Sequence, residues 1–66
     1  MRVSYKRLWK LLIDRELLKK DLARIANISS YTISKMGNDD NVTVDVLGKI
    51  CYALGCKLDD IMEFLP

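Results

Sequence analysis

Two apolar patterns interrupted at Asn27 constrain the fold of this 66-residue chain more than any other feature. Apolar residues recur three or four positions apart in residues 22–26 and again in residues 28–36, which is the spacing of a helix with one buried face. Asn27 tolerates the left-handed backbone that ends many helices, and Ser29 follows it as a favoured N-cap. The stretch therefore predicts two short helices joined by a tight turn.

Apolar spacing and end signals predict five helices in total. We expect them over residues 4–15, 19–26, 30–36 and 44–54, followed by a short fifth helix through Leu58, Ile61, Met62 and Leu65. Ser4 and Thr43 would cap the first and fourth helices. A chain of this length forms one small domain, so residues 1–66 are expected to fold as an all-α bundle around a single core.

Charge is distributed unevenly along the chain. Residues 1–35 hold nine basic and three acidic residues, a net charge of +6, whereas residues 36–66 hold two basic and six acidic residues, a net charge of −4. A polyanion would be attracted to the first half and repelled by the second. Solvated helix faces also carry mixed charge, but here the basic half contains the two joined helices, which favours binding to DNA.

The residues around Asn27 carry a family resemblance. Asp21-Leu22-Ala23, Asn27-Ile28-Ser29 and Ile33-Ser34 together resemble the helix-turn-helix of Cro and phage repressors (the XRE family), and residues 47–61 are similar to the closing two helices of that family. The resemblance extends over residues 4–65. It implies a compact five-helix, lambda-repressor-like bundle that places residues 29–36 in the major groove of double-stranded DNA as a transcriptional regulator, with repression as the expected effect.

The expected DNA contacts fall into two groups. Base contacts are expected from the outward face of the recognition helix, namely Ser30, Tyr31, Ser34 and Lys35. Phosphate contacts are expected from Lys19, Lys20, Ser29, Thr32, Lys6 and Lys10. Among these, Lys19 stands where the family usually has a glutamine that binds a phosphate.

Several positions depart from the family pattern. Leu18 replaces the usual Ser or Thr cap, so we expect the helix over residues 19–26 to begin loosely. Lys19 and Lys20 place two cations in its first turn, where they oppose the helix dipole. Asp39 and Asp40 follow the recognition helix, where relatives approach the DNA backbone with basic residues.

The composition argues against an enzyme and against a metal site. The chain has no histidine, no phosphate-binding glycine loop and no paired nucleophile and base, so no catalytic residue, metal or cofactor is expected. Cys51 and Cys56 are interpreted as buried small apolar residues in a reducing compartment. No signal peptide or membrane span is predicted, which favours a cytoplasmic protein of a bacterium or mobile element, and no small-molecule ligand is inferred.

Large apolar residues raise the question of a partner. Trp9, Tyr52, Phe64 and Leu65 could complete a thin core or line a seam between two copies. Relatives usually bind DNA as symmetric dimers, so we expect a weak or DNA-assisted homodimer. The alternative function is a protein-interaction module, such as an antitoxin-like partner, whose binding would depend less steeply on salt than DNA binding does.

Overall fold

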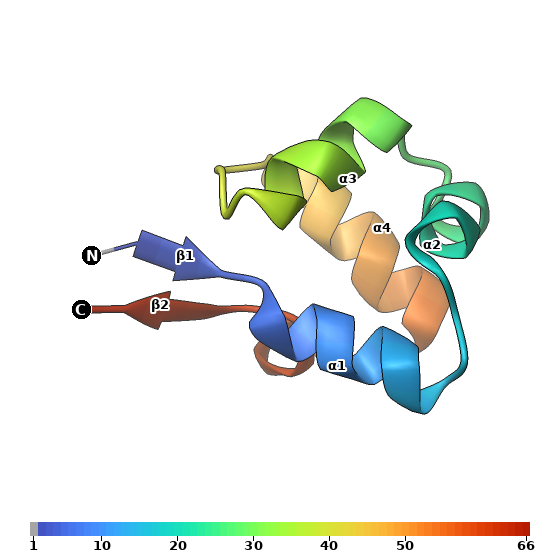
Figure 1. Ribbon diagram of the computed structural model, residues 1–66, viewed down its shortest axis with the longest axis horizontal. Coiled ribbons are helices and arrows are strands. Elements are labelled where there is room, and N and C mark those ends of the chain that lie inside the picture. Colours follow the sequence, from blue (N-terminus) through green and yellow to red (C-terminus); the bar gives the residue numbers. More distant parts are fainter. Residues whose placement is uncertain (1) are drawn as a thin grey trace.

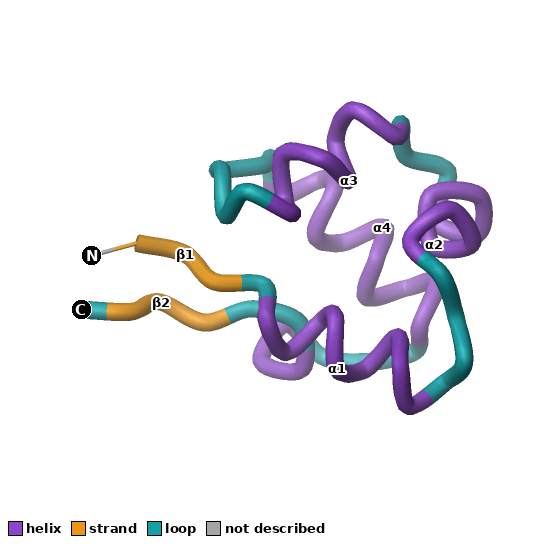
Figure 2. Tube along the Cα trace, in the orientation of Figure 1, coloured by secondary structure: helices purple, strands orange, loops and turns teal. Residues whose placement is uncertain are grey.

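The computed structural model describes residues 2–66, which form four α-helices, a short 3-10 turn and a two-stranded antiparallel sheet (Figure 1). The elements follow in the order β1 (Arg2–Ser4), α1 (Lys6–Asp14), α2 (Lys19–Ala26), α3 (Ser30–Gly37), α4 (Val44–Leu54), the 3-10 turn η1 (Leu58–Asp60) and β2 (Glu63–Leu65). The two strands lie side by side at one end of the molecule, and the helices form the rest (Figure 2). The mostly helical class is confirmed.

The expected fifth helix is wrong for the part of the chain that the structure describes. Leu58, Ile61 and Met62 have helical spacing, but only the single turn η1 forms there, and Ile61 and Met62 are buried after it. The chain then extends into β2, whose Phe64 pairs with Val3 of β1. This pairing satisfies the backbone N–H and C=O groups of both strands, and aromatic and β-branched residues favour strands. A local sequence pattern cannot predict the pairing, because the two strands lie some sixty residues apart in the chain.

The first helix is shorter than the apolar spacing predicts. It begins only at Lys6, because β1 extends to Ser4 and Tyr5 is the N-cap, and it ends at Asp14. Ser4 lies in the strand, yet its hydroxyl accepts a hydrogen bond from the Lys6 amide at 3.3 Å. Ser4 therefore still satisfies one free amide of the helix, from one position earlier than a regular N-cap.

The turn between α2 and α3 forms as the sequence predicts. Asn27 is left-handed, with φ of 55°, and ends α2. Ser29 caps α3, since its Oγ accepts a hydrogen bond from the Thr32 amide at 3.1 Å. Ile28 is half-buried and Ile33 is buried, so apolar contacts fix the angle at which the chain enters α3.

One apolar core holds all the helices together. Its most completely buried side chains come from every helix and from both ends of the chain: Tyr5, Leu8, Leu22, Met36, Ile50 and Ile61. The helix α2 packs against both α3 and α4. Because α2 has only eight residues, this packing contributes more to its stability than its own helical propensity does, and it also holds α2 beside α3.

The two cysteines lie closer together than their spacing on a helix suggests. Gly55 ends α4 in the left-handed conformation, with φ of 62°, and turns the chain back. The Cys56 amide then donates a hydrogen bond to the Cys51 carbonyl oxygen at 3.0 Å. Both thiols are free, half-buried and packed against the core. Burial is the main cause of a raised pKa of the Cys56 thiol, and the neighbouring Cys51 raises this pKa further.

Candidate nucleic-acid interface

A shallow hollow between α2 and α3 brings together side chains from both groups of expected DNA contacts. Lys19 and Lys20 line it from the first turn of α2, and Ser30 and Ser34 line it from α3; Ala23 and Ile33 complete it. Its volume is about 230 Å³. We call these six residues the α2–α3 hollow. The structure thus places two lysines directly beside two serines of the recognition helix, although they lie at least ten residues apart in the chain.

The hydroxyl groups of Ser29 and Thr32, at the start of α3, are hydrogen-bonded to each other. The Oγ atom of Ser29 lies 2.9 Å from Oγ1 of Thr32 and also accepts the Thr32 amide. Ser29 is exposed, whereas Thr32 is half-buried. Both side chains therefore contribute to capping α3, and Ser29 is the more accessible of the two to a ligand.

Tyr31 and Lys35 lie one turn apart on α3. The Tyr31 side chain is 72% exposed, and the Lys35 Nζ lies 6.0 Å from the centre of its ring. Such a separation is at the outer limit of a cation–π contact, so it restrains the lysine only weakly. Lys35 is half-buried, so Tyr31 is the more accessible of the two to a groove that α3 enters.

The start of α2 is held in a way that the sequence analysis missed. Leu18 provides no side-chain cap, but the Asp21 Oδ2 accepts a hydrogen bond from the Leu18 amide at 2.9 Å. This is the reciprocal half of a capping box, and the spacing of Asp21 three residues after the cap position was the signal for it. The expected loose start is wrong for this reason. The Asp21 carboxylate also places one negative charge beside Lys19 and Lys20.

The remaining expected phosphate contacts lie elsewhere. Lys6 and Lys10 are exposed on α1, and neither lines the α2–α3 hollow. Lys10 instead lines a second hollow together with Asp14, Asp59 and Asp60. Arg7 and Arg15 line the same hollow, so three basic and three acidic side chains balance there, whereas no carboxylate lines the α2–α3 hollow.

The acidic loop after α3 is anchored to the start of α1. The Tyr5 hydroxyl donates a hydrogen bond to the Asp40 carbonyl oxygen at 3.0 Å, and the Tyr5 amide donates to Asp39 Oδ1 at 3.4 Å. Asp39 is left-handed, with φ of 57°, a conformation that Asp adopts more readily than most residues. Burial raises the pKa of Tyr5, and the carboxylates of Asp39 and Asp40 raise it further. These aspartates thus have a structural role in the loop.

Arginines and lysines of the basic half are used differently. Arg7 Nε forms an ion pair with Glu63 Oε2 at 2.7 Å, and Arg15 donates to the Leu54 carbonyl oxygen at the end of α4. Within residues 2–66, by contrast, no ion pair includes Lys19, Lys20 or Lys35. Arg7 and Arg15 therefore join parts of the fold, whereas Lys19 and Lys20 of the α2–α3 hollow form no salt bridge within residues 2–66.

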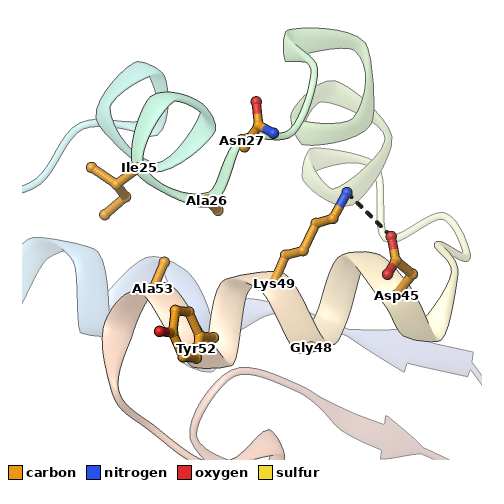
Figure 3. A pocket seen from close by; sticks show the side chains of 8 residues that line it. All are labelled: Ile25, Ala26, Asn27, Asp45, Gly48, Lys49, Tyr52 and Ala53. Carbon is orange, nitrogen blue, oxygen red and sulfur yellow. Dashed lines mark ion pairs between the residues drawn. The ribbon is translucent and has the colours of Figure 1, made fainter.

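A larger open hollow lies between α2 and α4 (Figure 3). It has a volume of about 520 Å³ and is lined by Ile25, Ala26, Asn27, Asp45, Gly48, Lys49, Tyr52 and Ala53. Its charged groups neutralise each other, since Lys49 Nζ lies 3.2 Å from Asp45 Oδ2 (Figure 3). No sequence pattern predicts this hollow, because its two walls come from segments about twenty residues apart. Its lining lacks the uncompensated positive charge of the α2–α3 hollow.

Trp9 contacts the candidate interface from α1. The Lys19 Nζ lies 4.5 Å from the centre of the Trp9 ring. From the sequence, Trp9 is expected only as a core or seam residue, and no local signal links positions 9 and 19, which lie on different helices.

The described residues contain no group of three or more His, Cys, Asp or Glu side chains that could hold a metal ion. No helix within residues 2–66 has the length and apolar character needed to cross a membrane.

Comparisons with known proteins support the helix-turn-helix fold. The family model of the Cro/C1-type HTH DNA-binding domain matches residues 7–66. A crystal structure of the transcriptional regulator VanUg (form II) is similar over 98% of this chain and 87% of that chain, with 48% sequence identity and a TM-score of 0.94. No curated protein sequence matches the chain.

Proposed function

Because this chain belongs to the Cro/C1-type helix-turn-helix DNA-binding family, we propose that it is a transcriptional regulator that binds a specific site in double-stranded DNA. The similar crystal structure is that of a transcriptional regulator, which supports the same role here. We propose repression as its effect, since a bound helix-turn-helix domain can occlude a promoter by itself.

The observation that carries the proposal is the α2–α3 hollow, where two lysines without ion pairs flank two exposed serines. In the proposed complex α3 lies in the major groove, where Ser30, Tyr31, Ser34 and Lys35 contact base edges. Lys35 donates to guanine O6 and N7, and the serines bond to whichever base their position allows.

Phosphate contacts fix the position of α3 and supply much of the affinity. We propose Lys19 and Lys20 as the principal phosphate ligands because they begin the helix beside α3. Ser29 and Thr32 are secondary, since each hydroxyl already bonds within the cap. Lys6 and Lys10 would contact the backbone only where the DNA extends past α1. The hollow that Lys10 lines holds as many carboxylates as basic groups, so it attracts phosphate less than the α2–α3 hollow does.

A homodimer on DNA is part of the proposal. One recognition helix reads only a few base pairs, so a second copy on an adjacent half-site would supply the remaining specificity. Phe64 of β2 is 63% exposed, which leaves apolar area at the end of the molecule for a weak contact between copies. Sedimentation that gives a strict monomer both free and on the selected duplex would remove the dimer from the proposal.

Selection of bound duplexes from a random pool tests the function directly. We expect enrichment of one sequence with two-fold symmetry, and affinity for it that falls steeply as salt is added. Lys35→Ala should weaken binding to that duplex by about tenfold, whereas Asp59→Ala in η1 should leave it unchanged. Failure to enrich any sequence would contradict the proposal and favour a protein-interaction module instead.

A further inference from the structure

The Lys19 side chain is held in place by residues of two other helices. Its Nζ lies 4.5 Å from the centre of the Trp9 ring on α1. The same atom lies 3.7 Å from the position that a Cβ would occupy on Gly37, the last residue of α3. The ammonium group therefore lies where α1, the first turn of α2 and the end of α3 meet, and the residue remains exposed to solvent.

Both neighbours favour a positive charge at this point. The face of an indole ring attracts a cation, and tryptophan is the aromatic residue that does so most strongly. The end of a helix carries partial negative charge on its last carbonyl groups, which also attracts a cation. Lys20, the next residue, has no described aromatic contact within residues 2–66, so this arrangement is particular to Lys19.

Restraint of a lysine before binding affects affinity. A free lysine side chain samples many rotamers, and a bound phosphate would have to select one of them at an entropic cost. The Trp9 ring reduces that cost because it already restricts the ammonium group to one side of the α2–α3 hollow. Trp9 is itself half-buried and packs against the core, so its ring is well fixed.

We propose that Trp9 is a positioning residue for DNA binding, whose ring holds the Lys19 ammonium group where a phosphodiester of the duplex meets α2. The inference rests on the proposed function, since it concerns the same interface. Trp9 contributes through Lys19, without a contact of its own to the DNA. The Lys19 ammonium group, held in this way, takes the place of the hydrogen-bonding amide that a glutamine would supply at position 19.

A double-mutant cycle tests this coupling. Binding to the selected duplex is measured for the wild type, Trp9→Leu, Lys19→Met and the double variant. We expect Trp9→Leu to weaken binding about threefold when Lys19 is present and to have no further effect in the Lys19→Met background. Trp9→Phe should retain part of the affinity because it keeps an aromatic face. Tyr52→Leu, which removes a 92% exposed aromatic residue outside the interface, should leave binding unchanged.

Spectroscopy of the wild-type protein tests the geometry without any substitution of Trp9. Protons above an aromatic ring are shielded, so the Lys19 ε-methylene protons should resonate upfield of those of the other lysines. Ordinary shifts for these protons would overturn the inference even if Trp9→Leu failed to fold. Equal losses from Trp9→Leu in both backgrounds would overturn it as well, since Trp9 would then act only through stability. If the wild type bound no duplex, the proposed function and this inference would both fail, whereas tight wild-type binding with no coupling would remove the inference alone.

Discussion

The first turns of α2 and α4 carry opposite charges, although both expose the positive end of a helix dipole. In α4, Thr43 Oγ1 accepts the Val46 amide at 3.3 Å, and Asp45 adds a negative charge that pairs with Lys49. In α2, Leu18 offers no side-chain cap and two lysines follow it. The arrangement in α4 stabilises the free chain, whereas that in α2 costs stability unless an anion is bound.

This difference between the two helix starts is consistent with the proposed DNA contact at α2. Departures from local rules in a folded chain tend to occur where the chain functions. Asp21 partly offsets the two lysines by accepting the Leu18 amide and by its charge, so α2 forms without a ligand. The positive charge that remains lies beside α3, where the proposed DNA phosphate would neutralise it.

Reversal of the two α2 charges should have the largest effect. We expect Lys19→Glu with Lys20→Glu to weaken binding to the selected duplex by about a hundredfold at low salt, because two phosphate attractions become repulsions. The slope of log affinity against log salt should fall by about two. Fluorescence anisotropy over a range of salt concentrations measures both quantities.

A matched control separates this interface from net charge. Lys49→Glu with Lys57→Glu changes the charge of the chain by the same amount but alters α4 and the start of η1. We expect a much smaller loss of affinity from this pair. Equal losses from the two pairs would mean that long-range attraction alone governs binding, and the contrast between α2 and α4 would have no functional meaning.

Removal of the Tyr5 hydroxyl should loosen the loop that leads into α4. Tyr5→Phe loses the hydrogen bond to the Asp40 carbonyl oxygen, and we expect the free energy of unfolding to fall by about 1 kcal/mol. Within residues 2–66 no ion pair joins the lysines of α2 to this loop, so binding per folded molecule should change little. Urea denaturation followed by circular dichroism gives the stability, and anisotropy gives the binding.

The same tyrosine predicts a pH dependence. The pKa of Tyr5 is raised in the folded chain, mainly by burial, so the folded state retains the phenolic proton to higher pH than the unfolded state does. Its stabilising contribution is complete below the ordinary pKa of 10.0 and is lost as pH rises through the raised value. The wild type should therefore lose more stability than Tyr5→Phe above that pH. Parallel stability curves for the two proteins would contradict the assignment.

Truncation of the α4 cap should affect stability alone. Thr43→Ala leaves the Val46 amide without its side-chain acceptor, and we expect a loss of about 1 kcal/mol. Leu18→Ala at the corresponding position of α2 removes no cap, so its cost should be smaller. Chemical denaturation of the two variants compares them. A larger loss for Leu18→Ala would show that apolar contacts of that side chain outweigh capping.

The smallest expected effect is a gain in the stability of the free protein, whereas the other substitutions lower stability or affinity. Lys20→Glu places a negative charge at the positive end of α2 and should stabilise the free protein by a few tenths of a kcal/mol while it weakens DNA binding. Asp45→Lys in α4 should destabilise by a similar amount with little effect on binding. Thermal denaturation measures the stabilities. If Lys20→Glu destabilised the free protein, α2 and α4 would not differ in the way proposed.

Local signals explain which parts of the fold the sequence predicts. Asn27 and Ser29 specify the turn between α2 and α3 within a few residues, and the structure has that turn. The fifth helix was wrong because β2 pairs with β1 at the other end of the chain, and apolar spacing around Ile61 fits a buried turn as well as a helix. Nothing in the spacing distinguishes the two.

The candidate site also has one part that the sequence predicts and another part that depends on how the helices pack. Ser30, Ser34 and Lys35 follow from the helical periodicity of one segment, and Lys19 and Lys20 follow from their place at a helix start. The Trp9 contact with Lys19 could not be predicted, because it depends on how α1 packs beside α2. The separation of Lys10 from the α2–α3 hollow depends on the same packing, which no pattern within α1 reveals.

Titration of the ¹⁵N-labelled protein with the selected duplex tests the central proposal most directly. We expect the amide resonances of residues 19–21 and 29–36 to shift together as duplex is added, while those of α4 around Asp45 and Lys49 stay near their free positions. Shifts concentrated at the α2–α4 hollow or at β2, with residues 29–36 unchanged, would contradict it.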